Sequence, residues 1–304
     1  MMGQYKAKFP LGRINDIQGR PENFKLLERV PLTLPEMKWP MKLLEPVGDE
    51  KKMVLLDVES TGGNIHDDEI TELGMVSILY SPSTGKVTSI EKVISLFDDP
   101  GKPIPEKITE LTGITDGMVK GEKIDETLVV EWLQDATYIV AHYAYFDRNM
   151  FEKRFSRLNE YKWACSIQGI DWESLGFKNL SLDVLLMRLG WFFDAHRATV
   201  DCLAMAWLFH LVPEALQSLI SKAQKRSVRI HAVGAPFSVK DYLKERNYHW
   251  FNDGDVSGKY WWREVPVGQL EEEKYFLDNL YQQGSKKAEY FYLDASNRYK
   301  KVEH

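Results

Sequence analysis

The stretch that most constrains the fold runs from Met53 to Gly62 and has the sequence MVLLDVESTG. Its first four residues form an apolar run that suits a buried strand. Asp57 and Glu59 follow two residues apart, and because side chains alternate along a strand, both carboxylates project from the same face. Buried charges must be paired or must coordinate a metal, so a cation site is one interpretation of the pattern. An acidic strand end that faces water is the other, and this stretch alone favours neither.

Length and composition limit the domain count, the cellular compartment and the kinds of partner that we expect for this chain. The 304 residues are enough for one large domain and one small domain. A formal net charge of -6 gives no global basic field that would attract nucleic acid, but bound divalent cations reverse the local sign of an acidic site. Cys165 and Cys202 are too few for a disulfide framework and fit a reducing compartment. We find no signal-peptide pattern and no run near the ~18 apolar residues of a membrane span, so we expect a cytoplasmic chain without a membrane partner.

The chain divides into three predicted parts. Residues 1–50 are rich in proline, which blocks long helices and central strands, so we expect an extended arm with one short helix between Pro21 and Arg29. Residues 51–225 have the alternation of helices and strands expected of an α/β domain. Residues 226–304 are rich in aromatic side chains and form a predicted small α+β domain.

Local patterns give the expected elements of the last two parts. In residues 51–225 we expect three consecutive antiparallel strands, a helix closed by Gly113, a helix capped by Asp125 and a buried parallel strand at 137–141. In residues 226–304 the expected order is β-α-β-β-α-β, with a turn at 252–254. The predicted ranges are strands 53–56, 70–80 and 86–97, helices 106–111 and 125–134, then strand 228–233, helix 238–246, strands 248–251 and 259–265, helix 270–282 and strand 289–293.

Two further stretches carry acidic residues at junctions. In AHYAYFDRNMFEKRF, Asp147 lies near the start of a helix that follows a strand ending at His142. In DAHRATVDCLA, His196 and Asp201 are five residues apart, and on one continuous helix they would diverge by ~140°. They can converge only if His196 lies on the loop before the helix and Asp201 lies in its first turns. Taken singly, each residue also has an ordinary explanation as a helix-start acid, a loop histidine or a solvated helix acid.

Together the three stretches give D-x-E-x-T-G, H-x-x-x-F-D and H-R-A-x-x-D, in that order. Their order, spacing and context resemble the DnaQ-like exonucleases of the DEDDh class, a family that includes the epsilon proofreading subunit of bacterial DNA polymerase III. The resemblance runs from about Met53 to Leu211. One position departs from it, because the family usually has asparagine where this chain has Tyr143.

The resemblance implies a ribonuclease H-like fold, which is a mixed sheet with helices on both faces, here followed by the small C-terminal α+β domain. It also implies that four carboxylates hold two Mg²⁺ (or Mn²⁺) ions and that His196 takes the proton from the attacking water. The implied metal ligands are Asp57, Glu59, Asp147 and Asp201. The implied substrate-binding residues are Ser60, Thr61, Gly62, Thr112, Gly113, His142 and Phe146, although we expect Phe146 to pack in the core.

The expected function is a metal-dependent 3′–5′ exonuclease that releases nucleoside 5′-monophosphates from the 3′ ends of DNA. Its role can be proofreading, repair or the clearing of short fragments, and the sequence does not choose among them. One alternative is the same chemistry on RNA, as in the oligoribonuclease and ribonuclease T branches of the superfamily. Another is a non-catalytic subunit that binds nucleic acid or a polymerase. A DNA polymerase is a candidate partner, although 282–304 has no obvious clamp-binding peptide. The aromatic residues after 226 suit either a small core or base binding.

Overall fold

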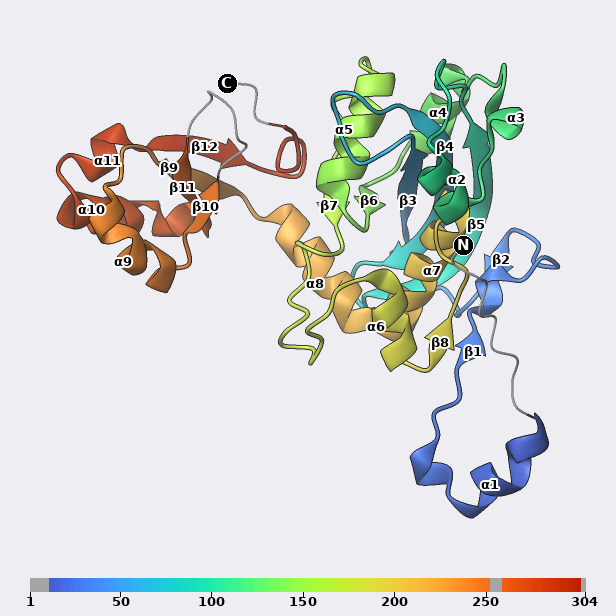
Figure 1. Cartoon of the computed structure of the whole chain (residues 1–304). Helices are drawn as coiled ribbons and strands as arrows, with labels where there is room; N and C mark the ends of the chain where they lie inside the picture. Colours follow the sequence, from blue (N-terminus) through green and yellow to red (C-terminus); the bar gives the residue numbers. More distant parts are fainter. Residues whose placement is uncertain (1–10, 252–258, 302–304) are drawn as a thin grey trace.

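A six-stranded mixed sheet forms the centre of the larger lobe (Figure 1). The computed structural model describes residues 11–251 and 259–301. The strand order is β2-β5-β4-β3-β6-β7. The antiparallel part is β2 (Met41–Lys42), β5 (Lys86–Phe97), β4 (Ile70–Ser81) and β3 (Lys51–Ser60), while β6 (Ile139–Ala141) and β7 (Trp163–Cys165) run parallel to β3.

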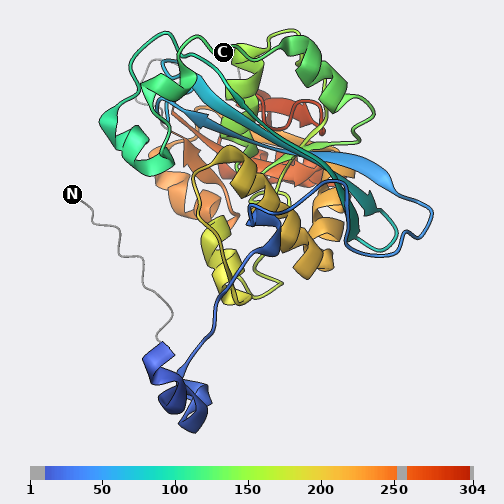
Figure 2. The ribbon, with the colours of Figure 1, turned by 90° about the vertical axis from the view of Figure 1, so that its right-hand side faces the viewer.

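Both faces of this sheet are covered by helices because β3 is apolar on both sides (Figure 2). Met53 and Leu55 pack in one core cluster with residues of α7 and α8, whereas Val54 and Leu56 pack in a second cluster with residues of α4 and α5. This arrangement confirms the expected mixed sheet with helices on both faces. The covering helices are α4 (Glu126–Leu133), α5 (Ala144–Arg154), α6 (Leu182–Arg188), α7 (Ala198–Leu211) and α8 (Pro213–Gln224).

The local signals for helix ends are confirmed. Helix α2 (Glu106–Thr112) stops at Gly113, whose φ of 73° lies in the left-handed region that glycine adopts without a steric cost. Asp125 caps α4 by accepting a hydrogen bond from the Thr127 N–H at 2.8 Å. A short α3 (Asp116–Val119) lies between them.

In the described part of the chain no single helix is long and apolar enough to span a membrane. Helices α7 and α8 reach the required length and apolar content only when taken together, and the chain bends by 104° between them.

The N-terminal segment projects from the lobe and then docks on it (Figures 1 and 2). The short helix predicted between Pro21 and Arg29 is wrong, since α1 lies earlier, at Ile14–Gly19, and Pro21 opens only a 3₁₀ turn. The residues that follow are extended or buried instead: β1 (Glu28–Arg29) pairs in parallel with β8 (Trp191–Phe192) in a separate two-stranded sheet, and Val30 and Leu32 are buried in the core. The 3₁₀ turns here are η1 (Leu11–Arg13), η2 (Pro21–Asn23) and η3 (Pro31–Thr33).

A second sheet, of four antiparallel strands, forms the smaller lobe. Its order is β10-β11-β9-β12, and the elements follow the expected β-α-β-β-α-β sequence with one added short helix. The predicted turn at 252–254 lies outside the described residues. The elements are β9 (Ser227–Ala232), η4 (Phe237–Val239), α9 (Lys240–Glu245), β10 (His249–Phe251), β11 (Tyr260–Pro266), η5 (Val267–Gln269), α10 (Leu270–Leu280), α11 (Gly284–Lys287) and β12 (Glu289–Leu293).

After β12 the chain returns to the larger lobe, and we call residues 294–301 the C-terminal tail. The Trp163 N–H at the edge of the six-stranded sheet donates to the Ala295 carbonyl at 2.7 Å. Tyr299 is 3% exposed and packs in the same core cluster as α5. The tail is therefore part of the core of the larger lobe, although a division of the sequence at 226 assigns it to the smaller one.

Helix α7 approaches the sheet most closely at Gly74 of β4. Gly74 pairs with Asp57 across the β3–β4 ladder. A Cβ atom on Gly74 would lie 2.4 Å from the Ala198 carbonyl carbon and 2.5 Å from the Thr199 nitrogen. Both are backbone atoms in the first turn of α7, so they cannot move aside without moving the helix. The absence of a side chain at this position thus sets how close α7 lies to β3.

We predict that Gly74→Ala destabilises the protein by about 2 kcal/mol, because overpacking forces the backbones of β4 and α7 apart. Urea denaturation measures the change. Gly268→Ala is the matched control, since a Cβ there meets nothing within 4 Å, and its effect should stay within ~0.5 kcal/mol. Equal stability of the two variants would contradict the close approach.

Candidate active site

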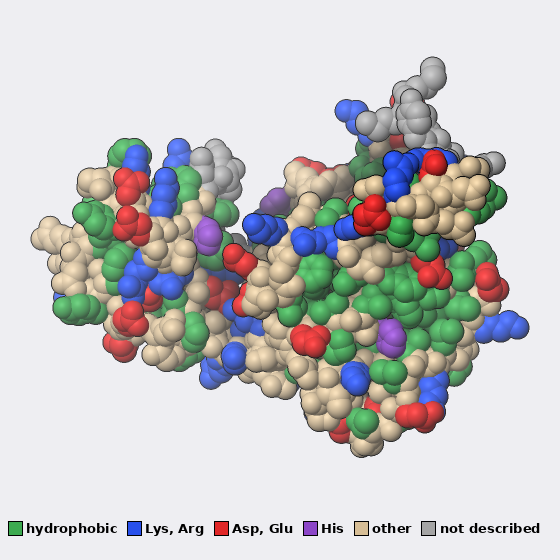
Figure 3. Space-filling view, turned by 90° about the horizontal axis from the view of Figure 1, so that it is seen from below, with side chains coloured by type: hydrophobic (Ala, Val, Ile, Leu, Met, Phe, Trp, Pro, Cys, Tyr) green, Lys and Arg blue, Asp and Glu red, His purple; other side chains and the backbone are tan. Residues whose placement is uncertain are grey.

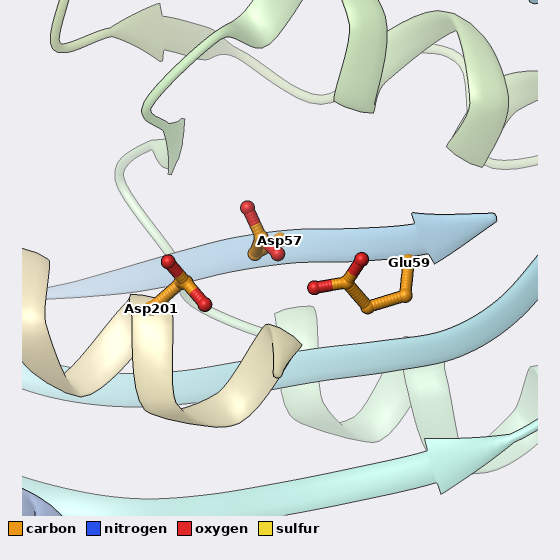
Figure 4. Close-up of side chains that lie close together, drawn as sticks. All are labelled: Asp57, Glu59 and Asp201. Carbon is orange, nitrogen blue, oxygen red and sulfur yellow. The ribbon is translucent and has the colours of Figure 1, made fainter. Parts of the chain in front are cut away.

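Three carboxylates meet at the end of β3. Asp57 and Glu59 come from β3 and Asp201 comes from the first turn of α7 (Figure 4). Each offers one oxygen atom, and these atoms all lie within 4.8 Å of one another. All three side chains are half-buried. Oxygen-only donor sets of this kind suit hard divalent cations such as Mg²⁺ and Mn²⁺.

Asp147, the fourth predicted ligand, lies against the same strand. It occupies the first turn of α5 and is 3% exposed. Its Oδ1 accepts a hydrogen bond from the Val58 N–H, between Asp57 and Glu59, at 3.2 Å. The group of three carboxylates does not include Asp147, but its charge contributes to the raised pKa of Asp57. The start of α5 is thereby fixed to the acidic end of β3.

The electrostatics of the four carboxylates favour the binding of a cation. Burial, reinforced by mutual repulsion, raises the pKa of Glu59 to about 8 and the pKa of Asp57 well above its usual range. Burial likewise raises the pKa of Asp147 and of Asp201 to about 7, although backbone N–H groups oppose the rise at both. A bound divalent cation would stabilise the ionised form of these carboxylates and so offset their repulsion. The residues therefore fit the metal site that the sequence predicts.

The histidine loop is built onto the Asp201 carboxylate. His196 has a φ of 71°, which is the left-handed region, and its side chain is exposed. The backbone N–H groups of His196 and Arg197 both donate to Asp201 Oδ2, at 2.9 and 3.1 Å. Helix α7 begins at Ala198, so His196 lies on the loop and Asp201 in the first turn. This is the arrangement that the five-residue spacing requires for the two to converge.

An ion pair between a buried acid and a half-buried arginine, which the sequence analysis missed, supports the same loop. Glu72 is 0% exposed and lies directly opposite Glu59 in the β3–β4 ladder. Its carboxylate accepts two hydrogen bonds from the Arg197 guanidinium, at 2.9 and 3.1 Å, and one from the Ala198 N–H at 3.3 Å. The available signal was a lone acid inside the apolar strand 70–80, which needs a cation when buried.

The last residue of β3 and the loop after it contain three of the predicted substrate-binding residues. The Thr61 hydroxyl donates to Asp68 Oδ1 at 2.8 Å, and the Ser60 hydroxyl donates to the Gly62 carbonyl at 2.5 Å. A Cβ on Gly62 would lie 2.5 Å from Asp68 Oδ2, which also accepts from the Asn64 N–H at 2.9 Å. These residues fold the loop around Asp68, which the sequence analysis did not single out.

The remaining predicted binding residues make mostly internal contacts. The two ring nitrogens of His142 bond Ser166 Oγ at 2.6 Å and the Leu180 carbonyl at 2.8 Å, which leaves neither for a nucleotide. Phe146 packs against the core cluster beneath α5, as expected. Thr112 is buried and its hydroxyl donates to its own helix, whereas Gly113 is exposed at the end of α2.

We predict that the chelated protein loses stability as the pH rises from about 4.5 to about 8. The folded-state pKa values of the cluster are raised, so its contribution to stability is present below the unfolded-state value of 4.5 for Glu59 and is lost as the pH rises through about 8. Thermal unfolding in EDTA measures this. Mg²⁺ should raise the Tm more at the upper end of the range than at the lower end.

Asp201→Asn should flatten the pH dependence in EDTA, whereas Glu110→Gln, at an exposed position of α2, should leave it unchanged. A Tm in EDTA that rises over the same pH range would contradict the electrostatic account of the cluster.

Comparisons with known proteins place these residues in one family. The model of the family described as "Exonuclease" matches residues 54–209, which hold all four acids and His196. The chain is 32% identical over 171 residues to the PolC-type DNA polymerase III of Thermotoga maritima, which covers 51% of this chain and 11% of that protein. It is 31% identical over 198 residues to the PolC-type enzyme of Bacillus subtilis, covering 60% of this chain and 12% of that protein. The chain thus spans about a tenth of the length of these relatives.

Two solved structures are also similar. Exonuclease X in complex with 5′ overhanging duplex DNA matches with 23% identity and a TM-score of 0.42, covering 56% of this chain and 99% of that one. The nuclease domain of 3′hExo, a DEDDh family member bound to rAMP, matches with 18% identity and a TM-score of 0.43, covering 53% and 90%. The family match extends over half of the chain and contains the whole acid cluster, so this chain belongs to the exonuclease family, in agreement with its DnaQ-like motifs.

Proposed function

We propose that this protein is a metal-dependent 3′–5′ exonuclease that removes nucleoside 5′-monophosphates from the 3′ ends of DNA. The observation that supports it most is the convergence of Asp57, Glu59 and Asp201 within 4.8 Å, inside the segment matched by the exonuclease family. Asp147 completes a set of four carboxylates at the end of β3. The division into 1–50, 51–225 and 226–304 belongs to this proposal, with the chemistry in the middle part.

The four carboxylates are the groups that would hold a pair of Mg²⁺ or Mn²⁺ ions. They come from three elements, β3, α5 and α7, so the site forms only in the folded chain. When bound, divalent cations supply Lewis-acid activation of phosphodiester hydrolysis and neutralise charge on the phosphate. The carboxylates position these charges, and burial keeps competing water away from them.

His196 is the general base of the proposal. Its imidazole is exposed on a loop at the edge of the acid cluster, where it can accept a proton from a water that attacks the phosphorus atom. The backbone of the same residue is held by the Asp201 carboxylate at 2.9 Å. One carboxylate therefore serves the cation site and also fixes the position of the base.

DNA is the proposed substrate because the similar PolC-type proteins are named as DNA polymerases. The test uses matched 5′-labelled single-stranded DNA and RNA oligonucleotides, with Mg²⁺ or with EDTA. A Mg²⁺-dependent ladder that shortens from the 3′ end of DNA is the expected result. A ladder formed mainly on RNA would transfer the same chemistry to an exoribonuclease, and no ladder on either substrate would contradict the proposal. A polymerase is a candidate partner.

His196→Ala should lower kcat by about 100- to 10,000-fold, the usual contribution of a general base, while binding of the oligonucleotide changes little. Asp57→Asn should abolish Mg²⁺-dependent cleavage. Single-turnover kinetics and equilibrium binding separate the two effects. An equal loss of turnover and of binding in His196→Ala would assign the histidine a structural role instead.

Glu72→Ala should lower activity by about 10- to 100-fold, because Arg197 then loses the partner that holds the His196 loop. Glu69→Gln is the matched control, since Glu69 lies just before β4 in a surface ion pair with Lys153 that contributes little. The decisive readout is the Mg²⁺ concentration for half-maximal activity, which should rise in Glu72→Ala alone. Unchanged Mg²⁺ dependence would limit Glu72 to a role in stability.

A further inference from the structure

The four-stranded sheet of the smaller lobe has two different faces. Across the β10–β11 pair, Trp250 lies opposite Trp261, and His249 lies opposite Trp262. Because side chains alternate along strands, the first pair points to one face and the second pair to the other. Trp261 packs in a core cluster with residues of α9 and α10, including Leu277. The face of His249 and Trp262 therefore points away from those helices.

This second face carries a cation beside its rings. The Arg229 guanidinium of β9 lies 5.1 Å from the centroid of the Trp262 ring. The His249 ring lies on the other side, with its centroid 5.3 Å from that of Trp262. Trp262 and Arg229 are half-buried and His249 is exposed. The three side chains form a continuous row across the sheet.

The C-terminal tail attaches this face to the larger lobe. Arg298 of the tail bonds Glu264 Oε1 at 3.1 Å, and the Arg229 guanidinium lies 3.9 Å from Glu264 Oε2. Lys222 of α8 lies 3.6 Å from the same carboxylate. With three cations around it, Glu264 does not present a free negative charge to an anionic ligand.

The same tail reaches the first turns of α5. Asn149 of α5 donates to the Tyr299 carbonyl of the tail at 2.9 Å and to the Tyr145 carbonyl at 2.5 Å. The tail thus links Glu264 of the second sheet to Asn149 of α5, and Figure 1 shows the tail beside this helix.

Two exposed tyrosines continue the row toward the acid cluster. Tyr143 is 48% exposed and Tyr145 is 36% exposed, and their ring centroids are 6.4 Å apart. The backbone carbonyl of Tyr143 accepts the N–H of Asp147 at 3.3 Å, so the Tyr143 backbone lies one helical turn from a proposed metal ligand. We name the whole set the aromatic row. It consists of His249, Trp262, Arg229, Tyr145 and Tyr143.

Aromatic rings beside a cation are features that bind single-stranded nucleic acid, since any base stacks on an aromatic face and any phosphate pairs with a cation. The chain as a whole has a net charge of -6, so attraction must come from a local track rather than from a global field. Basic side chains do gather with acidic ones where the two lobes meet (Figure 3).

We propose that the aromatic row binds the single strand upstream of the 3′ end and guides it from the smaller lobe into the acid cluster. This inference rests on the proposed exonuclease function. Bases would stack on Trp262 and on the two tyrosines, with Arg229 pairing a phosphate between them. Because these contacts lie upstream of the bond that is cut, they act on long strands and not on a dinucleotide.

The test compares kcat/KM on a long single-stranded oligothymidylate with kcat/KM on a dinucleotide. Trp262→Ala should lower the ratio of the two values about tenfold, the effect of losing one stacked base, and mainly through KM. Trp250→Ala is the matched control, because it removes a 49% exposed tryptophan from the opposite face of the same hairpin. Arg229→Gln is the second variant and keeps the measurement valid where Trp262→Ala does not fold.

The outcomes separate the two proposals. A wild-type protein that cleaves neither substrate overturns the exonuclease function itself. Cleavage of both substrates, with a length ratio that Trp262→Ala and Arg229→Gln leave unchanged, overturns the aromatic row alone. An equal fall of the ratio in Trp250→Ala would also overturn it, because the effect would then not depend on the face.

Discussion

Repulsion among four crowded carboxylates, one buried and three half-buried, is the interaction on which the structure of the active site depends. Asp57, Glu59, Asp147 and Asp201 crowd the end of one strand, and burial raises the pKa of each. Their repulsion destabilises this end of β3, and bound cations would reduce that repulsion. In sites of this kind the unfavourable electrostatic free energy lies where the chemistry occurs. The surrounding strands and helices have to hold the carboxylates together against their repulsion.

The restraining contacts lie mainly around the first turn of α7. Gly74 lets the backbone of α7 approach β4, and the pair of buried Glu72 with Arg197 holds the loop that precedes α7. Asp201 then accepts the N–H groups of that loop and so positions His196. On the other side, Val58 holds Asp147 through its backbone. A few contacts between β3, β4, α5 and α7 thus set the positions, the burial and the charge of the active-site side chains.

The sequence predicts strands, helix caps and the site motifs well, because each depends on local periodicity or on spacing within one segment. The Asp125 cap and the Gly113 stop are local signals of this kind. The pairing of Glu72 with Arg197 joins residues 125 positions apart, so only the fold reveals it. The same holds for Tyr299, which leaves the smaller lobe to enter the core of the larger one. The N-terminal helix was misplaced because tertiary docking of Val30 and Leu32 decides that segment rather than its own propensity.

Calorimetric titration of the full chain with Mn²⁺ tests most directly whether the four carboxylates bind a divalent cation. It is carried out at neutral pH in two buffers of different ionisation enthalpy. Carboxylates with a pKa of about 7 to 8 are partly protonated there, so binding must release protons. We predict saturable binding with net proton release, which disappears in Asp57→Asn while the fold is retained. Binding without proton release, or binding that Asp57→Asn leaves unchanged, would contradict the view that the acid cluster is the cation site.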